Sequence, residues 1–222
     1  MSEAAARVLL LRHGEVASHR GDVPVTEEGL THAERVGKTL AHQLDGPVSV
    51  LFGGTRRTRE TADAIVRGIG DRDRVSGPMD SFALRNPDMY VAGTRVNMVS
   101  SAESLAEQVP GMSTEQAAAN DWWSSFFVAP DRIGWWLGQE DPPGETAADL
   151  RLRVTRFVRT VSDPGPLQGR LVVCVTHSPV LRAVLLRATG ADPGEPAYVT
   201  GAEIEVPAAA PIAVRPFDPL SA

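Results

Sequence analysis

The sequence predicts a three-layer α/β/α sandwich around a mostly parallel central sheet. Short apolar runs, typical of strands that are covered on both faces, occur at three places along the chain. These runs lie at 7–11, 48–52 and 170–177. Each run is followed by a segment in which apolar residues repeat at helical spacing, at 27–44, 57–69 and 179–189. Such alternation favours parallel strands joined by helical crossovers, and we expect one domain over residues 1–222.

Each predicted element has its own local signals. The first helix is expected to begin after Thr26, a suitable N-cap, because Glu27 and Glu28 then fall in its first turn. The run "RLVVCVTH" at 170–177 has the strongest strand pattern in the chain. The remaining regular segments are a helix at 145–161 and two closing strands, "GAEIEV" at 201–206 and "PIAVRP" at 211–216.

Residues 80–140 interrupt this regularity and form a variable excursion from the sheet. Ser113 and Gln116 have the spacing of a capping box, which predicts a helix start. An aromatic-rich stretch follows, made of Trp122, Trp123, Phe126, Phe127, Trp135 and Trp136. These side chains suit either a local hydrophobic core or an exposed surface that acts as a lid or supports a homodimer.

Composition limits the classes of partner. The formal net charge is −6 and the pI is near 5.4, which argues against a general nucleic-acid binder and against binding to an anionic membrane. A small anionic substrate remains compatible, because a basic pocket can exist on an acidic protein. Cys174 is the single cysteine, so no internal disulfide is expected. The chain shows neither a signal-peptide pattern nor a long apolar span, and we expect a cytoplasmic protein.

Histidines and arginines follow the predicted strands. "LLLRHG" places His13 after the first strand, and "VCVTHS" places His177 after another. The junction "FGGTRRTRE" supplies Arg56, Arg57 and Arg59. Ligands of open α/β sheets bind beyond the carboxyl ends of the strands, so these side chains are expected at one rim. Arginine forks suit phosphate oxygens, and a neutral imidazole is a competent nucleophile toward phosphorus.

In the order of these motifs the chain resembles the histidine phosphatase superfamily, which is phosphoglycerate mutase-like. The resemblance rests on five ordered segments: "RHGE" at 12–15, "PVTEEG" at 24–29, "RTRETA" at 57–62, "PGETAADLRLRV" at 143–154 and "VTHSP" at 175–179. It implies that His13 is the nucleophile, that Arg12 and Arg57 bind phosphate, and that His177 is a second catalytic and phosphate-binding histidine. It also places Glu145 near the phosphate, and it implies no cofactor. A metal held by the two histidines is disfavoured, because no carboxylate or thiol has matching ligand spacing.

Three departures from the family pattern affect the expected chemistry. His19 stands where an asparagine is common, and Arg20 is a possible substitute for its phosphate contact. "FGG" at 52–54 replaces a serine-serine-proline segment and suggests a more open pocket floor. Asn86 stands where the family often has a glutamate that protonates the leaving group, and an asparagine cannot transfer a proton. Asp88 is the first candidate for this acid and Glu145 the second, although Asp88 suits a simple turn cap equally well.

The sequence thus favours a phosphomonoester hydrolase that acts on a small phosphorylated metabolite through a phosphohistidine. One alternative is a phosphate-binding or interaction protein of the same fold without turnover, which Asn86 and "FGG" favour. A phosphoglycerate mutase is a further alternative, but mutases of that type have a longer central insert with an acidic-arginine-histidine-tyrosine-glycine stretch, which "RNPDMYVAG" does not match. The substrate depends on 80–140, the part without a match.

Overall fold

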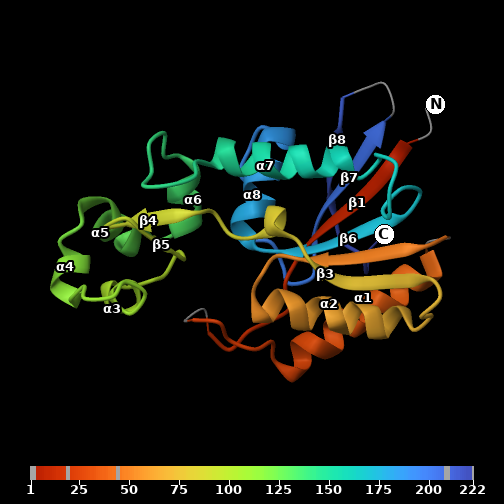
Figure 1. The fold of residues 1–222 in the computed structure, drawn as a ribbon, viewed down its shortest axis with the longest axis horizontal. Helices are drawn as coiled ribbons and strands as arrows, with labels where there is room; N and C mark the ends of the chain where they lie inside the picture. Colours follow the sequence, from red (N-terminus) through yellow and green to blue (C-terminus); the bar gives the residue numbers. More distant parts are fainter. Residues whose placement is uncertain (1–3, 19–20, 44–45, 208–210, 222) are drawn as a thin grey trace.

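The protein is built around a six-stranded sheet, described here from a computed structural model that covers residues 4–18, 21–43, 46–207 and 211–221 (Figure 1). The strand order is β3-β2-β6-β1-β7-β8. The bounds are β1 Ala4–Arg12, β2 Val48–Phe52, β3 Val75–Asp80, β6 Leu171–Thr176, β7 Gly201–Pro207 and β8 Ala213–Phe217. The pairs from β3 to β1 are parallel, whereas β7 and β8 pair antiparallel, so the sheet is mostly parallel as predicted.

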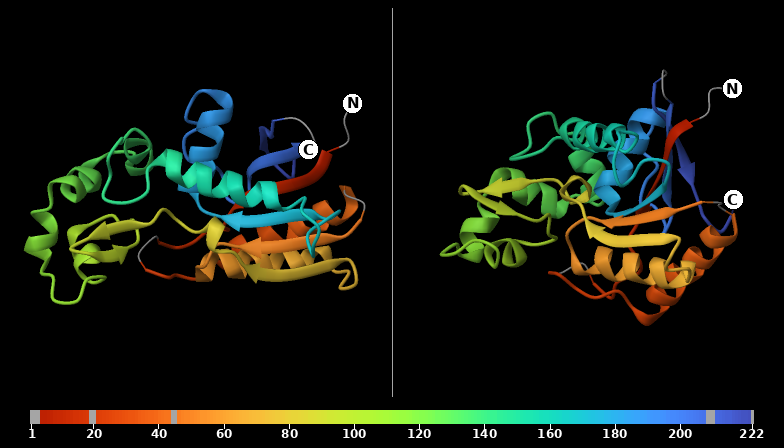
Figure 2. Two further views of the ribbon diagram at one scale, coloured as in Figure 1. Left: turned by 45° about the horizontal axis from the view of Figure 1, so that its top comes forward. Right: turned by 45° about the vertical axis from the view of Figure 1, so that its right-hand side comes forward.

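Helices cover both faces of this sheet. Helices α1 (Glu27–Gln43) and α2 (Arg56–Ile69) pack on one face, where they bury Leu9 and Leu11 of β1. Helices α7 (Ala147–Thr160) and α8 (Ser178–Thr189) cover the other face, onto which Val8 and Leu10 project. Alternate residues of one strand therefore enter different cores, as the two-residue period of a strand requires. Figure 2 shows the resulting three layers, which confirms the predicted sandwich.

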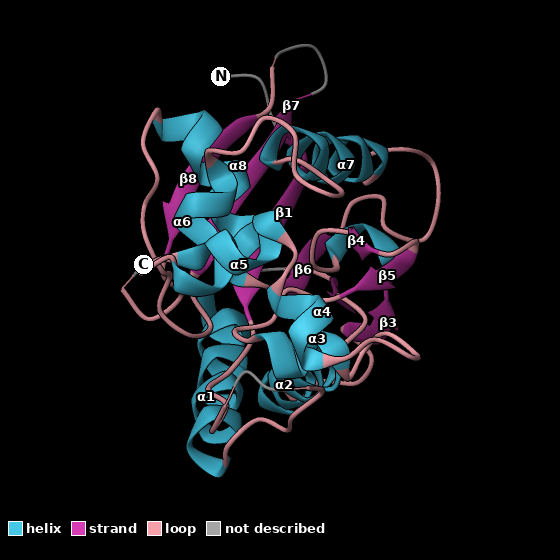
Figure 3. Ribbon diagram, turned by 90° about the vertical axis from the view of Figure 1, so that its left-hand side faces the viewer, coloured by secondary structure: helices cyan, strands magenta, loops and turns pink. Residues whose placement is uncertain are grey.

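The excursion extends from the carboxyl end of the sheet (Figures 1 and 3). Its elements are a short 3-10 turn at Phe82–Leu84, the hairpin β4 (Met89–Val91) and β5 (Thr94–Val96), and helices α3 (Ala102–Ala106), α4 (Thr114–Ala118), α5 (Asp121–Val128) and α6 (Arg132–Leu137). Trp123, Phe126 and Trp136 are fully buried, and Trp122 stacks on Phe126 with ring centroids 5.4 Å apart. The aromatic cluster is therefore a local core, continuous with the core under α7 and α8.

Several local predictions are confirmed, whereas one strand of the central sheet and the two strands of the hairpin in the excursion were missed. Thr26 caps α1 by accepting the Gly29 N–H at 3.0 Å, and the capping box of Ser113 with Gln116 is formed. Leu44, expected at the end of α1, lies outside the described residues. The missed strand of the central sheet is β3, whose sequence "VSGPMD" has little apolar content and contains Gly77 and Pro78. No helix among the described residues is long and apolar enough to cross a membrane.

Candidate active site

The carboxyl ends of three neighbouring strands bring the predicted site together. Arg12 at the end of β1 pairs with Thr176 at the end of β6, and Phe52 at the end of β2 pairs with Val175. One residue further on, the His13 N–H donates to the Thr176 carbonyl at 3.0 Å. This register places His13 beside His177, and their ring centroids are 5.6 Å apart. Both imidazoles are almost fully buried.

A backbone carbonyl sets the tautomer of His13. The Nδ1 atom lies 2.7 Å from the Gly14 carbonyl oxygen, which only accepts hydrogen bonds, so Nδ1 carries the proton. The neutral ring then has its lone pair on Nε2. The turn that supplies this carbonyl is itself fixed, because the Gly14 N–H donates to the Thr61 hydroxyl at 2.8 Å. His13 is thus held with a nucleophilic nitrogen, as an attack on phosphorus requires.

A backbone carbonyl also orients His177, but it contacts the other ring nitrogen, Nε2. Its Nε2 lies 3.1 Å from the Gly53 carbonyl oxygen, which makes Nε2 the donor and leaves Nδ1 without a proton in the neutral ring. Burial, together with the positive charge of Arg57, holds the pKa of His177 well below its usual value of 6.5. His177 also occupies the N-cap position of α8, where the helix dipole favours a bound anion.

The arginines that line the site are Arg12 and Arg57. Arg12 is buried, stacks over the Tyr198 ring at 4.2 Å, and donates from Nη1 to the Pro196 carbonyl at 2.5 Å. Its Nη2 pairs with Glu195 at 2.6 Å. Arg57 comes from the first turn of α2, and burial lowers its pKa. Within the described part of the chain, Arg12 Nε, Arg57 Nε and His177 Nδ1 are buried nitrogens without a hydrogen-bond partner.

The other arginines of the "TRRTRE" junction lie outside the site. Arg56 pairs with Glu60 at 2.7 Å, and Arg59 is exposed near Asp63 on the same helix. Neighbouring residues of a helix project in directions about 100° apart. Of these three arginines, only Arg57 points toward the histidines and lines the same cavity.

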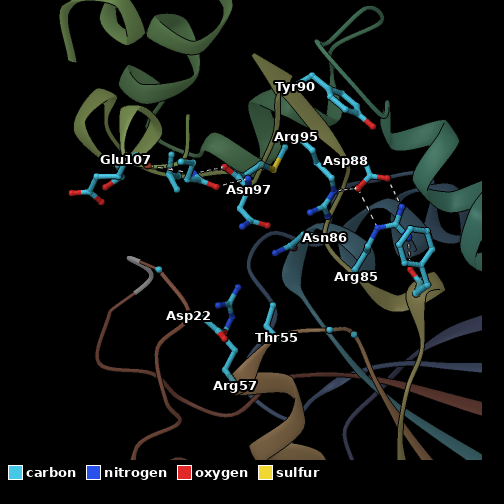
Figure 4. A pocket seen from close by; sticks show the side chains of 18 of the residues that line it. Asp22, Thr55, Arg57, Arg85, Asn86, Asp88, Tyr90, Arg95, Asn97 and Glu107 are labelled. Carbon is cyan, nitrogen blue, oxygen red and sulfur yellow. Dashed lines mark hydrogen bonds and ion pairs between the residues drawn. The ribbon is translucent and has the colours of Figure 1, made fainter. Parts of the chain in front are cut away.

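Two connected cavities surround these groups. The first, here called the inner cavity, has a volume of about 420 Å³ and is lined by Arg12, His13, Arg57 and His177, with a roof of excursion residues that includes Met98, Val99 and Ile133. The second, here called the outer lobe, has a volume of about 720 Å³ and is shown in Figure 4. Arg57, Asn86, Met98 and Val99 line both cavities and mark the passage between them.

The surroundings of Asp88 do not suit a general acid. Asp88 lines the outer lobe and is hydrogen-bonded to both Arg85 and Arg95 (Figure 4). Burial raises the pKa of Asp88, but the hydrogen bonds from the two arginines outweigh this effect and the net pKa is lowered. An acid that stays ionised near neutral pH cannot donate a proton to a leaving group. The geometry therefore argues against the catalytic role expected for Asp88.

Glu145 lies away from the phosphate-binding groups, which corrects the expectation that it binds phosphate. Its carboxylate pairs with Arg153 at 2.8 Å and accepts the Asp88 N–H at 2.9 Å. Arg153 also donates to backbone carbonyls between Phe82 and Asn86. The pair therefore fixes the segment that carries Asn86 and Asp88, and a carboxylate in this role would repel a phosphate rather than bind it.

Two further carboxylates line the inner cavity without having been predicted. Asp131 is bound by the buried Arg182, whose hydrogen bonds lower the pKa of Asp131 to about 2. Glu195 accepts from the Ser178 hydroxyl at 2.6 Å in addition to pairing with Arg12. Glu195 belongs to the loop between α8 and β7, and only the adjacency of β7 to β1 brings it to Arg12. No local sequence signal marks it.

The departures from the family motif are explained in part by packing. A Cβ atom on Gly53 would lie 2.2 Å from the Leu84 carbonyl oxygen, so the strand end needs glycine because another backbone approaches it. The expected open pocket floor is instead covered by this backbone. His19 and Arg20 lie outside the described residues. Among the described residues, no group of three or more histidine, cysteine, aspartate or glutamate side chains has the arrangement of a metal site.

The fold and the site define a class of α/β protein with two histidines and two arginines in a cavity at the carboxyl end of the sheet. A family model described as histidine phosphatase superfamily (branch 1) matches residues 8–76 and 100–206, more than half of the chain. The chain therefore belongs to the histidine phosphatase superfamily, and its enzyme class is of the phosphatase or mutase type.

Individual relatives support the same assignment. A 2,3-bisphosphoglycerate-dependent phosphoglycerate mutase of Rhizobium etli is 27% identical over 186 residues, which cover 80% of this chain and 77% of the mutase. The structure of a protein called mycobacterial hydrolase 1 aligns with a TM-score of 0.62 at 18% identity, covering 96% of this chain and 97% of that one. A mycobacterial glucosyl-3-phosphoglycerate phosphatase, solved with inorganic phosphate, aligns with a TM-score of 0.61 at 19% identity, covering 96% of each chain. At these identities the two structures establish the shared fold.

Proposed function

We propose that the protein is a phosphomonoester hydrolase that acts on a small phosphorylated metabolite through a phosphohistidine at His13. The observation that carries this proposal is the set of buried nitrogens around His13 that lack a partner within the described residues: Arg12 Nε, Arg57 Nε and His177 Nδ1. A buried polar group without a partner costs about 1–3 kcal/mol, and more when it is charged. A phosphoryl group provides several acceptor oxygens and satisfies all of these nitrogens at once.

The reaction proceeds in two steps at phosphorus. First, the lone pair of His13 Nε2 forms a bond to phosphorus while the bond from phosphorus to the ester oxygen breaks, and the departing oxygen takes a proton from solvent water. A water molecule then attacks phosphorus, the bond to Nε2 breaks, and inorganic phosphate leaves with His13 restored. Arg12 and Arg57 hold the oxygens of the transferred group, and their positive charge offsets the negative charge that develops there.

His177 is expected to work in its protonated form when phosphate is bound. Its Nε2–H is committed to the Gly53 carbonyl, so Nδ1 can donate to a phosphate oxygen only after it gains a proton. The negative charge of the phosphate favours this protonation and reverses the pKa depression of the empty site. Phosphate binding is therefore coupled to uptake of a proton.

The supply of the proton for the leaving group shapes the expected substrate preference. Asn86 lines the passage beside Arg57 and has no proton to transfer. Of the carboxylates near the site, Asp88, Asp131 and Glu195 are each paired with an arginine. Asp22, which lines the outer lobe with Arg57, is exposed and accepts the Arg56 N–H at 2.8 Å. We therefore expect activated aryl esters to be hydrolysed fast, and alkyl esters, whose leaving group needs a proton, to be hydrolysed slowly. The same observation favours the second candidate, a phosphate-binding protein of this fold without turnover.

The test compares hydrolysis of p-nitrophenyl phosphate by the wild type and by His13→Ala from pH 4 to pH 9, with and without a chelator. We expect activity that resists the chelator and disappears in His13→Ala. His42→Ala is the matched control, because His42 is exposed at the end of α1. Circular dichroism and the melting temperature verify that His13→Ala is folded. Full activity in folded His13→Ala would refute the mechanism, and an inactive wild type that still binds phosphate would favour the binding protein.

A further inference from the structure

The outer lobe is the space into which the non-phosphate part of a substrate extends, and this inference rests on the proposed function. A phosphoryl group at His13 lies in the inner cavity, whose passage to the outer lobe is lined by Arg57 and Asn86. The volume of about 720 Å³ is within the range of small-molecule sites. Figure 4 shows this space between Asp22 and Arg57 on one side and the hairpin β4-β5 with α3 on the other.

The charges of the outer lobe argue against a second anionic group on the substrate. Its described walls carry four carboxylates, from Asp22, Asp80, Asp88 and Glu107. Apart from Arg57, which belongs to the phosphate site, the guanidiniums among its described walls are Arg85 and Arg95. Arg85 donates from Nε and Nη2 to Asp88 and from Nη1 to the Phe82 carbonyl, and Arg95 donates from Nε to Asp88. The Asp88 carboxylate therefore offsets part of the positive charge of these two guanidiniums. With Arg57 included, four negative charges against three positive ones leave the described lining with a net charge of −1.

Neutral hydrogen-bonding side chains complete the lobe. Asn86 and Asn97 direct their amides into the space in Figure 4, and Tyr90 lies at its rim. Each amide offers both donors and acceptors, and the carboxylates of Asp80 and Glu107 offer further acceptors. Hydroxyl groups both donate and accept, so a ligand rich in hydroxyls matches this lining without bringing charge. The half-exposed Tyr90 ring adds an apolar surface for the carbon skeleton of such a ligand.

We infer that the outer lobe receives an uncharged, hydroxyl-rich group of the carbohydrate or polyol class, and that its carboxylates select against esters with a second anionic group. A second carboxylate on the substrate would enter a lining of net negative charge. Specificity here comes from repulsion of the wrong substrate as much as from hydrogen bonds to the right one.

The test uses two substrates that differ only in charge at the far end. Glucitol 6-phosphate and 6-phosphogluconate have the same chain length and the same primary phosphate ester, but the second ends in a carboxylate. We expect kcat/KM to favour glucitol 6-phosphate by roughly tenfold or more, because each unfavourable charge contact at 4 Å costs about 1 kcal/mol even in water. The dissociation constants of both esters for His13→Ala, measured by calorimetry, should show the same preference without turnover.

A pair of variants links the preference to the lobe. The double variant Asp80→Asn with Glu107→Gln removes two exposed carboxylates from the lining, and we expect it to reduce the preference severalfold. Glu140→Gln with Asp141→Asn is the matched control, because these exposed carboxylates lie outside both cavities and should leave the preference unchanged.

The outcomes separate this inference from the proposed function. Equal kcat/KM values and equal dissociation constants for the two esters would overturn it, as would a preference for 6-phosphogluconate. Stronger binding of phosphocholine than of glucitol 6-phosphate would also overturn it, because it would assign the lobe to a cation. If the wild type does not hydrolyse p-nitrophenyl phosphate, the proposed hydrolase activity is refuted but the selectivity of the outer lobe is not. The binding measurements on His13→Ala still decide that selectivity.

Discussion

Replacement of Asn86 by glutamate should give the site the proton donor that it lacks. Asn86 is partly buried and lines both cavities beside Arg57, so a carboxyl group there lies where the ester oxygen departs. Its backbone carbonyl accepts from Arg153, and this contact does not depend on the side chain. Glutamate is one methylene longer than asparagine, and the passage between the cavities offers room for it. Asn86→Glu should therefore leave the segment in place and change the chemistry.

The size of the effect follows from the protonated fraction of the new acid. General acid catalysis contributes roughly 10²- to 10⁴-fold when the acid is protonated and placed correctly. A glutamate with an ordinary pKa of about 4.3 is protonated to about one-sixth at pH 5 and to about 0.2% at pH 7. The positive charge of Arg57 lowers these fractions further. We therefore expect an increase of roughly 10- to 100-fold for an alkyl ester at pH 5, and little change above pH 7.

The assay compares an alkyl ester, glycerol 2-phosphate, with the activated aryl ester p-nitrophenyl phosphate between pH 4.5 and pH 8. Only the alkyl ester needs a proton on its leaving oxygen, so the ratio of the two rates should rise toward low pH in Asn86→Glu. Asn86→Gln is the matched control, because glutamine has the size of glutamate but no proton to give. An equal change for both esters, or the same change in Asn86→Gln, would refute the assignment of this position to the leaving group.

Three further outcomes are expected. The folded-state pKa of His177 lies below 6.5, so its contribution to stability is present above that pH and is lost as the pH falls below it. Because phosphate binding is coupled to proton uptake by His177, phosphate should raise the melting temperature more at pH 6 than at pH 8. His177→Gln should abolish this difference. Gly53→Ala should lower the free energy of unfolding by about 1–3 kcal/mol through overpacking, which is several degrees in melting temperature, and should weaken phosphate binding. Gly54→Ala is the control, because a Cβ there would lie 3.8 Å from its nearest neighbour. Its positive φ of 62° alone should destabilise this variant, which should bind phosphate normally. Asp88→Asn should change the hydrolysis rates of alkyl and aryl esters equally. It should improve binding of 6-phosphogluconate, because it releases Arg85 and Arg95 from their ion pairs. A loss of rate confined to alkyl esters would show that Asp88 is the general acid after all.

The parts of the fold that were predictable are those with strong local patterns. The buried strands β1 and β6 are continuous apolar runs, and the helices that follow them have apolar residues at helical spacing. Strand β3 lacks such a pattern because it lies at the edge of the sheet, where half of its residues are exposed and Gly77 and Pro78 are tolerated. Edge strands are defined by their pairing partner more than by their own composition.

The site shows the same division between local and distant determinants. His13, His177 and Arg57 were predictable because each follows a recognisable strand or opens a helix. The partners of these residues were not, because the pairing of β1 with β7 brings Arg12 to Glu195 and to Pro196, which is 184 positions away in the chain. The state of Asp88 was hidden for a similar reason: burial raises its pKa, and the hydrogen bonds that lower it come from Arg85 nearby in the chain and from Arg95 on β5. Sequence motifs identify which side chains gather at the carboxyl end of the sheet, but not which neighbours control their charge.

The distribution of charge around the site explains how an acidic protein can bind a dianion selectively. The chain has a net charge of −6, yet the inner cavity concentrates Arg12 and Arg57 around two buried imidazoles. In a buried site these charges act at short range and with little screening by salt, whereas the surface charges are screened within about 10 Å. Asp88 and Glu107 then make the outer lobe unfavourable for a further anion. A phosphate group on a neutral molecule is therefore attracted at one end and tolerated at the other, while a substrate with two anionic ends is repelled at the lobe.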